Sequence, residues 1–165
     1  MSRTIFGLIT VVAGLISTLL GGVIADKLRP RLPGSYFWVS GIGMLIACPF
    51  FIATLYIPFP AAWVAMFLAI FFLFLNTGPS NTALANVSLP AVRATAFAVN
   101  IFVIHALGDV QAFWLIGYIG GHTNMHVAFL FVSGIIFASG LAWIIGAKYL
   151  PADTAVVETA DVMKV

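Results

Sequence analysis

Long apolar stretches alternate with short segments that hold proline, glycine and charge along the whole chain. A membrane-spanning helix needs about 20 consecutive, mainly apolar residues, because each residue adds about 1.5 Å and the hydrocarbon core is about 30 Å thick. The pattern predicts an all-α membrane protein: a five-helix transmembrane bundle over residues 1–150 and a mobile cytoplasmic tail at residues 151–165. The five predicted spans lie near residues 5–25, 36–57, 61–87, 93–119 and 126–148.

The composition supports a membrane protein and excludes several other classes. Of the 165 residues, 62% are hydrophobic and 7% are charged, whereas about 25% of residues are charged in soluble globular domains. The formal net charge of +2 is too small, and the Lys and Arg residues are too scattered, for a nucleic-acid surface. Cys48 is the single cysteine, so a disulfide framework or a cysteine-based metal site is not available. The expected partner is therefore a lipid bilayer and not a nucleic acid.

The positions of the basic residues predict the orientation in the membrane. If five spans alternate in direction, two polar connections and the tail fall on one side, and they hold six of the seven Lys and Arg residues: Lys27, Arg29, Arg31, Arg93, Lys148 and Lys164. The loops at 57–60 and 120–126, on the other side, hold none. Cytoplasmic loops carry an excess of Lys and Arg. We therefore expect a multi-pass protein of the cell (inner) membrane, with the N-terminus outside and the C-terminus in the cytoplasm.

Small residues recur on one side of the first predicted span, at alternating steps of three and four. Such steps place side chains in one stripe along a helix, and small side chains let two membrane helices approach closely. The stripe predicts a close-packing seam. Its members are Gly7, Thr10, Gly14, Ser17 and Gly21.

The third predicted span contains the polar segment Asn76-Thr-Gly-Pro-Ser-Asn-Thr82. Pro79 lacks a backbone donor and clashes with the preceding turn, so the helix should kink or unwind there. Backbone groups freed at membrane depth need protein or a water-filled cavity to satisfy them. We expect the break from Asn76 to Asn81, together with Arg93, to shape the cytoplasmic half of a solute path.

An ionisable pair lies inside the fourth predicted span. His105 and Asp109 are four residues apart and share a helix face; counted from Arg93, they lie about 18 Å and about 24 Å into a core about 30 Å thick. An ionised Asp at that depth costs about 2.5–3.5 kcal/mol on insertion scales, so it should face the bundle or a wet cavity. Two readings remain open: a proton or ligand site, or a structural pair that pins two helices together.

The sequence does not predict an enzyme. No nucleophile pattern accompanies His105 and Asp109, and an intramembrane enzyme is the least favoured class. His122 and His126 also stand four apart, but the loop that holds them has no acidic residue, so we predict no metal site there. No cofactor is expected.

The polar segment after the first span resembles a known signature. Gly22-x-x-x-Asp26-Lys27, followed by Arg29 and Arg31, is similar to the cytoplasmic loop signature G-x-x-x-D-[RK]-x-G-R-[RK] of the major facilitator superfamily. Arg29 stands where the family usually has Gly, so the tight turn does not carry over. The resemblance implies that Gly22, Asp26, Lys27 and Arg31 form a conformational latch, which ties helix ends together in one transport state through a carboxylate at a helix N-terminus.

A second set of segments resembles the late helices of the Spinster-like branch of that superfamily. One departure is that Gln111-Ala-Phe113 stands where that branch typically has a small Ser-Pro element after the residue equivalent to Asp109. The segments are Asn76-Thr-Gly-Pro79, Asn86-Val-Ser-Leu-Pro90, Arg93-Ala-x-Ala96, Ile104-His-Ala-Leu-Gly-Asp109 and Leu115-Ile-Gly117.

The resemblance covers nearly the whole chain and implies a fold and a function. The five spans would be helices 8 to 12 of a twelve-helix transporter and would form part of its C-terminal half. In such transporters the cavity forms between the C-terminal half and an N-terminal half, which is missing here. The function implied is secondary transport of a small amphipathic, lipid-like or organic-anion solute by alternating access, with His105 and Asp109 as the titrating element of a proton-coupled cycle. The alternative is a small membrane scaffold or regulator that self-associates through the stripe of the first span.

Overall fold

The computed structural model describes residues 2–162, and all of its regular structure is helical. Among those residues, five helices or helix pairs are long and apolar enough to cross a membrane: Thr4–Leu28, Ser35–Tyr56, Ala62–Asn86, Arg93–His122 and Met125–Gly146. The predicted fold class, an all-α membrane bundle with five spans, is confirmed. Lys164 and the last residues of the predicted tail lie outside the described residues, and the mobility of the tail stays a prediction.

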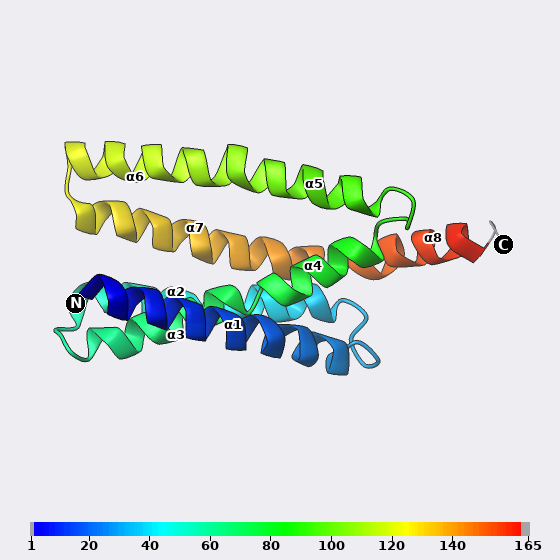
Figure 1. Ribbon diagram of the computed structural model, residues 1–165, viewed down its shortest axis with the longest axis horizontal. Coiled ribbons are helices and arrows are strands. Elements are labelled where there is room, and N and C mark those ends of the chain that lie inside the picture. Colours follow the sequence, from blue (N-terminus) through cyan, green and yellow to red (C-terminus); the bar gives the residue numbers. More distant parts are fainter. Residues whose placement is uncertain (1, 163–165) are drawn as a thin grey trace.

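The third span is divided into two helices (Figure 1), and the fourth is a continuous helix whose winding changes in its middle. The third consists of two helices with a break at Leu75 and Asn76, and the fourth contains a π-helical turn in its middle. A further helix follows the fifth span in the tail. The elements are α1 (Ser2–Leu28), α2 (Ser35–Tyr56), α3 (Ala62–Phe74), α4 (Thr77–Asn86), α5 (Arg93–Val103), η1 (Ile104–Asp109), α6 (Val110–His122), α7 (Met125–Gly146) and α8 (Leu150–Val162).

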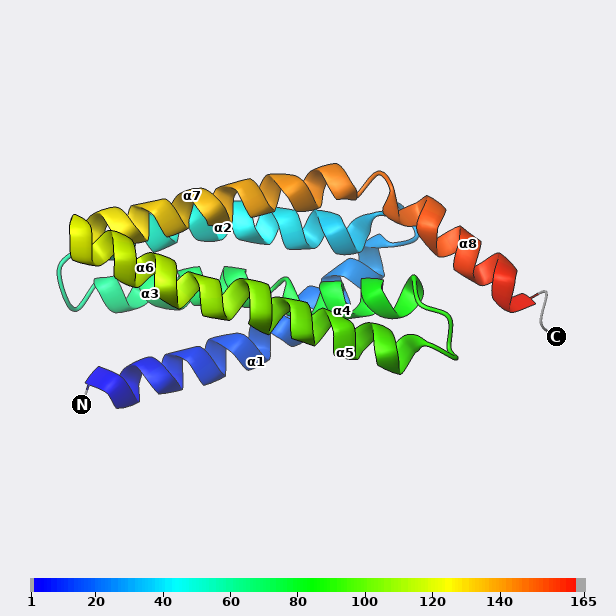
Figure 2. The ribbon, with the colours of Figure 1, turned by 90° about the horizontal axis from the view of Figure 1, so that it is seen from above.

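The connections α1–α2, α4–α5 and α7–α8 all lie at one end of the bundle (Figures 1 and 2). These connections hold or adjoin Arg29, Arg31, Arg93 and Lys148, and we call this the basic end. The connections α2–α3 and α6–α7 lie at the opposite end. The structure thus places these four basic residues at one end of the bundle, as the topology predicted from the sequence requires.

Close contacts between small residues hold the helices together. On α2, Gly41 lies against the backbone of Gly140 on α7, and its missing Cβ would fall 2.8 Å from the Gly140 carbonyl oxygen. The ring of Phe37 meets Trp143 edge-on beside them, with centroids 4.7 Å apart. Because lipid tails are as apolar as leucine side chains, close packing rather than burial of large apolar groups holds such helices together.

The stripe of the first span packs inside the chain along most of its length. Ser17 and Gly21 are buried, and Gly14 faces the ring of Phe74 on α3. Gly7 is the exception, because nothing would lie within 4 Å of a Cβ at that position. The seam predicted from the spacing is therefore an intramolecular contact of α1 with the interrupted third span.

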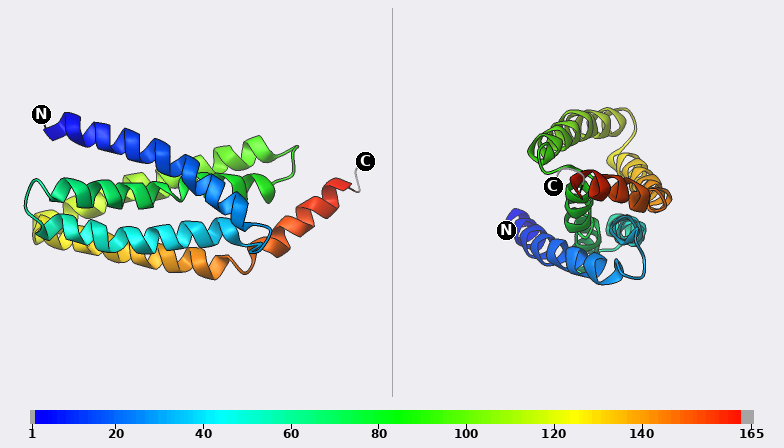
Figure 3. Two further views of the ribbon diagram at one scale, coloured as in Figure 1. Left: turned by 90° about the horizontal axis from the view of Figure 1, so that it is seen from below. Right: turned by 90° about the vertical axis from the view of Figure 1, so that its right-hand side faces the viewer.

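The long helix formed by α5, η1 and α6 lies at the edge of the bundle, beyond α7 (Figures 1 and 3). It packs mainly against α7 through α6, with a small contact between α4 and α5. None of the residues from Arg93 to His122 is buried within the chain. This span therefore presents most of its surface, including the two ionisable residues at its centre, to whatever surrounds the chain.

Candidate functional site

The π-helical turn η1 carries the ionisable pair. The Val110 N–H donates to the His105 carbonyl, five residues back, and this widened turn contains both candidate residues. His105 Nδ1 lies 2.5 Å from Asp109 Oδ2, and the two side chains are 66% and 55% exposed. π-Turns inside α-helices are frequent at functional sites. The sequence spacing predicted the contact, whereas the π-turn was not foreseen.

The break in the third span follows from Pro79 as expected. Pro79 has no N–H to offer the carbonyl of Leu75, and the break lies at that residue and Asn76. The neighbouring carbonyl of Phe74 accepts a hydrogen bond from the Thr18 hydroxyl of α1, at 3.4 Å. A side chain from another span thus satisfies one of the backbone groups at the break, as membrane helices require.

A cavity of about 530 Å³ opens beside the break. Helices α2, α4, α5, α7 and α8 and the turn η1 all contribute to its wall. Its lining residues are Phe37, Asn76, Ser80, Ala83, Leu84, Val87, Asn100, Ile104, Trp143, Leu150 and Asp153. We call this space the Asn76 cavity, and its walls belong to the half of the bundle nearer the basic end.

The residues predicted to line a solute path are only partly brought together. Asn76 lines the Asn76 cavity, and Ile104, the residue before His105, closes it on one side. Asn81 lies exposed on α4, outside the cavity lining. Arg93 is exposed at the start of α5, where its guanidinium donates to the Ser88 carbonyl at 3.3 Å.

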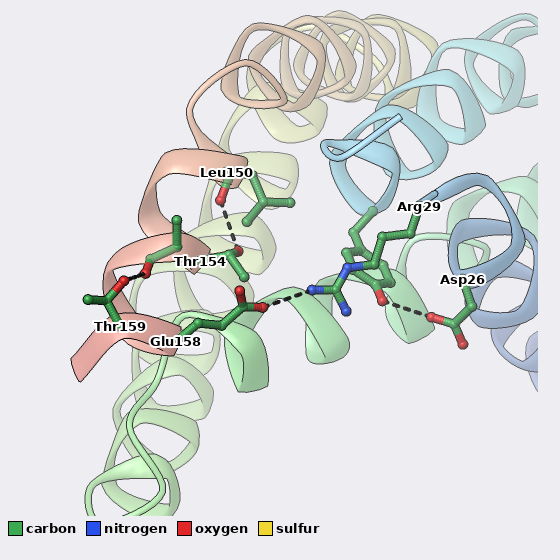
Figure 4. A network of polar contacts seen from close by, with 8 residues as sticks. Asp26, Arg29, Leu150, Thr154, Glu158 and Thr159 are labelled. Atoms are coloured by element: carbon green, nitrogen blue, oxygen red, sulfur yellow. Dashed lines mark hydrogen bonds and ion pairs between the residues drawn. The ribbon is translucent and has the colours of Figure 1, made fainter. Parts of the chain in front are cut away.

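The loop signature lies at the basic end and has partners within the chain (Figure 4). The Tyr36 hydroxyl at the start of α2 donates to Asp26 Oδ1 at 2.8 Å. Arg29 lies over the Tyr36 ring, 5.9 Å from its centroid, and pairs with Glu158 of α8 at 3.4 Å. The carboxylate expected to act as a latch is thus bound by the helix that follows it.

Gly22, Lys27 and Arg31 differ in their surroundings. Gly22 lies within α1, and its backbone nitrogen approaches Gly78 of α4. Lys27, in the last turn of α1, and Arg31, in the turn that follows, are both exposed. Neither cation forms an ion pair with a described residue.

Several polar residues that shape these sites were missed by the sequence reasoning. Asn100 and Ser80 line the Asn76 cavity, and Tyr36 and Glu158 complete the loop network. A signal existed for Asn100, because it stands one helical turn and a half before His105 in an otherwise apolar run. No sequence pattern marks Tyr36 or Glu158, because their partners lie 10 and 129 residues away.

The two histidines near the α6–α7 connection have different neighbours. His122 Nδ1 lies 2.9 Å from the Tyr118 carbonyl, and His126 lies beside the ring of Tyr56. No group of three or more His, Cys, Asp or Glu side chains among residues 2–162 could hold a metal ion.

The fold and these sites define a multi-pass membrane protein. Comparisons with known proteins identify the family to which it belongs. No protein-family model matches the chain. The chain is 29% identical over 148 residues to a probable sphingolipid transporter of Arabidopsis thaliana, spinster homolog 3; the alignment covers 86% of this chain and 28% of the relative. It is 40% identical over 118 residues to protein spinster homolog 3 of Danio rerio, covering 70% of this chain and 24% of the relative. A sphingosine-1-phosphate transporter of Danio rerio is 34% identical over 119 residues, covering 70% and 23%.

The chain belongs to the Spinster-like branch of the major facilitator superfamily. It spans about a quarter of the length of the curated relatives that it matches. The resemblance drawn from the sequence segments is thereby confirmed. The relatives named here are transporters or spinster homologs, which agrees with the prediction that the chain is not an enzyme.

Proposed function

We propose that this chain forms part of a secondary transporter that moves an amphipathic, lipid-like or organic-anion solute by alternating access. The names of two relatives, a probable sphingolipid transporter and a sphingosine-1-phosphate transporter, support a lipid-like solute. The discontinuous third span also supports transport, because transporter binding sites are typically built from interrupted helices.

The pair of His105 and Asp109 carries this proposal. Two ionisable side chains bonded to each other in the middle of a membrane span are costly unless protein or water surrounds them. Here both are more than half exposed, so the chain itself does not shield them. A solute path beside η1 would supply the polar surroundings, and a proton shared between the imidazole and the carboxylate could couple solute movement to a proton gradient.

The exposed face of α5, η1 and α6 fits a place within a larger transporter. We propose that the five spans are helices 8 to 12 and that this face lies toward an N-terminal half like that of the longer relatives. In such folds the path lies between two halves that rock against each other. Asn76, Asn81 and Arg93, at or near the basic end, would then shape its cytoplasmic half.

The loop network would act as the conformational latch in this cycle. Asp26 is bound by Tyr36 here, and a state in which α1 and α2 separate would release the carboxylate to a helix N-terminus elsewhere. Lys27 and Arg31 are exposed beside it, available to partners in the other half. The basic end would face the cytoplasm of the cell (inner) membrane, with the N-terminus outside.

The test of this function is uptake into vesicles by the natural gene product, whose intact mass is measured first. Asp109→Asn and His105→Gln should each abolish the pH dependence of uptake and most of its rate. His122→Gln is the matched control, because His122 belongs to the same long helix but bonds only to its own backbone in the described structure. Unchanged uptake and unchanged pH dependence in Asp109→Asn would refute the role of the pair.

The alternative of a self-associating scaffold draws no support from the fold. Its proposed contact surface was the small-residue stripe of α1, and Gly14, Ser17 and Gly21 pack within the chain instead. We therefore do not advance it as a second function.

A further inference from the structure

Another cavity lies in the half of the bundle opposite the basic end. Its volume is about 390 Å³, and small-ligand sites span about 300–1,000 Å³. Helices α1, α2, α3 and α7 contribute to its wall through residues that include Phe6, Phe51, Met66 and Phe129, respectively. We call this space the Phe51 cavity. It shares no lining residue with the Asn76 cavity in the described part of the chain.

The cavity exists because the first half of α1 stands away from its neighbours. Near the middle of α1, a Cβ at Gly14 would lie 3.3 Å from the ring of Phe74 on α3. Toward the start of the helix, a Cβ at Gly7 would meet nothing within 4 Å. The separation of α1 from α2 and α3 widens in the same direction in Figures 2 and 3. Phe6 of α1 therefore borders the cavity without filling it.

The wall of the cavity is almost entirely apolar. Thr54 is the single polar residue of the described lining, and its hydroxyl donates to the Phe51 carbonyl at 2.6 Å. No Asp, Glu, Lys, Arg or His belongs to that lining. A buried water needs about two to four polar partners, and the Thr54 oxygen is the one side-chain acceptor that the described lining offers. The cavity therefore suits neither water nor a charged group, whereas it suits a hydrocarbon.

The cavity lies at hydrocarbon depth and borders the surface that faces lipid. Met66 and Leu73 stand about 6 Å and about 16 Å along α3 from its start at Ala62, and half of a hydrocarbon core is about 15 Å thick. Phe6, at the edge of the cavity, is 48% exposed, and Leu8 on the same helix is 61% exposed. The cavity thus continues the lipid-facing surface of α1 into the bundle.

An empty space at this place would cost the surrounding side chains their contacts. Atoms that line a void lose their dispersion contacts on that side, and protein interiors hold few voids larger than a water molecule. A lipid tail at the same depth is already in an apolar environment, so it gains these contacts without losing favourable solvation. Met66 helps to accommodate such a chain, because an unbranched side chain adapts to irregular gaps.

We propose that the Phe51 cavity holds one acyl tail of a bilayer phospholipid, seated between the first half of α1 and helices α2 and α3. The tail contacts Phe6, Phe51 and Met66, and the head group stays outside the cavity at the surface of the bilayer. Because the described lining carries no charge, the site selects the tail and not the head group. The site is independent of the proposed transport function, since no residue of the candidate solute path belongs to its described lining.

The experiment places the full chain in nanodiscs of phosphatidylcholine that contain a small fraction of phosphatidylcholine with a diazirine in the middle of one tail. After irradiation, the labelled residues are mapped by mass spectrometry of peptides. Phe51 and Met66, which are half-buried residues of the lining, should be labelled. Ala69→Phe adds a ring at a lining residue that is 2% exposed, and it should lower this labelling about tenfold. Should Ala69→Phe fail to fold, Leu73→Trp fills the cavity from a half-buried lining residue, and the same loss is expected.

Lipid-facing positions provide the control. Leu8 and Val64 are 61% and 63% exposed and lie outside the lining, so they should be labelled equally in the parent and in the variant with a filled cavity. Val64→Phe adds bulk on the outside of α3 and should leave the labelling of Phe51 and Met66 unchanged. If Phe51 and Met66 are not labelled in the parent, or remain labelled in the filled variant, the proposal is overturned.

Two comparisons test the identity of the occupant. Phosphatidylglycerol with the same photoreactive tail should label the cavity to the same extent as phosphatidylcholine, and a difference of about tenfold would overturn a site for the tail alone. The natural gene product should be labelled at the same residues. Loss of the label in that protein alone would mean that another protein segment fills the cavity, which would overturn the assignment to lipid.

Labelling and transport outcomes separate this inference from the proposed function. Solute uptake by the natural gene product, with no label in the cavity, would refute the lipid site and leave the transport proposal intact. Label in the cavity without any solute uptake would refute the transport proposal and leave the lipid site standing.

Discussion

The contact of Gly21 with the helix break offers the sharpest test of the packing. A Cβ added to Gly21 would overlap the Leu75 carbonyl oxygen, and it would lie 3.0 Å from the Leu75 carbonyl carbon and 3.2 Å from Pro79 Cδ. Two of these atoms are backbone and the third belongs to a rigid ring, so none can rotate away. Gly22, the next residue, would meet nothing within 4 Å if it carried a Cβ.

The comparison of Gly21→Ala with Gly22→Ala isolates the cost of this contact. Both changes replace a glycine inside α1, and each gains about 0.5–1 kcal/mol of helix stability because alanine loses less backbone entropy. Only Gly21→Ala adds a methyl group to a filled space, which costs about 1–3 kcal/mol. The helix gain is common to both variants. Gly21→Ala should therefore be less stable than Gly22→Ala by about 1–3 kcal/mol, roughly a 5- to 150-fold difference in the unfolding constant.

The assay is reversible unfolding of the full chain in mixed detergent micelles, followed by tryptophan fluorescence and by circular dichroism. Gly22→Ala should unfold at a denaturant concentration equal to or above that of the parent. Gly21→Ala should unfold at a lower denaturant concentration than Gly22→Ala. Equal midpoints for the two variants would show that α1 does not approach Leu75 as described, and the packing of α1 on the third span would have to be abandoned.

Two further predictions concern the network at the basic end. Tyr36→Phe should lower the free energy of unfolding by about 1–1.5 kcal/mol, because Asp26 loses a hydrogen bond at 2.8 Å. The control Tyr56→Phe removes the hydroxyl of an exposed ring and should leave the free energy of unfolding unchanged. Equal effects of the two changes in thermal unfolding would contradict the contact between Tyr36 and Asp26. A double-mutant cycle of Arg29→Gln and Glu158→Gln should give a coupling below about 1 kcal/mol that falls with salt, because the side chains are 42% and 68% exposed. A coupling of several kcal/mol, insensitive to salt, would mean that α8 buries this pair.

The local features of this protein followed from its sequence. The five spans could be predicted because a bilayer of about 30 Å imposes a minimum apolar length on every crossing helix. The break near Pro79 followed from the missing N–H, and the contact of His105 with Asp109 followed from their spacing on one helix. The segments that resemble the Spinster-like branch were equally local and led to the family that the comparisons show.

The contacts between residues far apart in the sequence could be found only in the tertiary structure. Asn100 and Asp153 meet Asn76 at one cavity because α5 and α8 fold back beside the break, and Glu158 reaches Arg29 across 129 residues. Seam residues such as Gly21 could be recognised as small, but their spacing could not say whether they pack within the chain or against a second copy. Periodicity indicates which residues share a face of one helix. Which other helix covers that face depends on packing between distant segments, such as the close approach of the Leu75 carbonyl to Gly21.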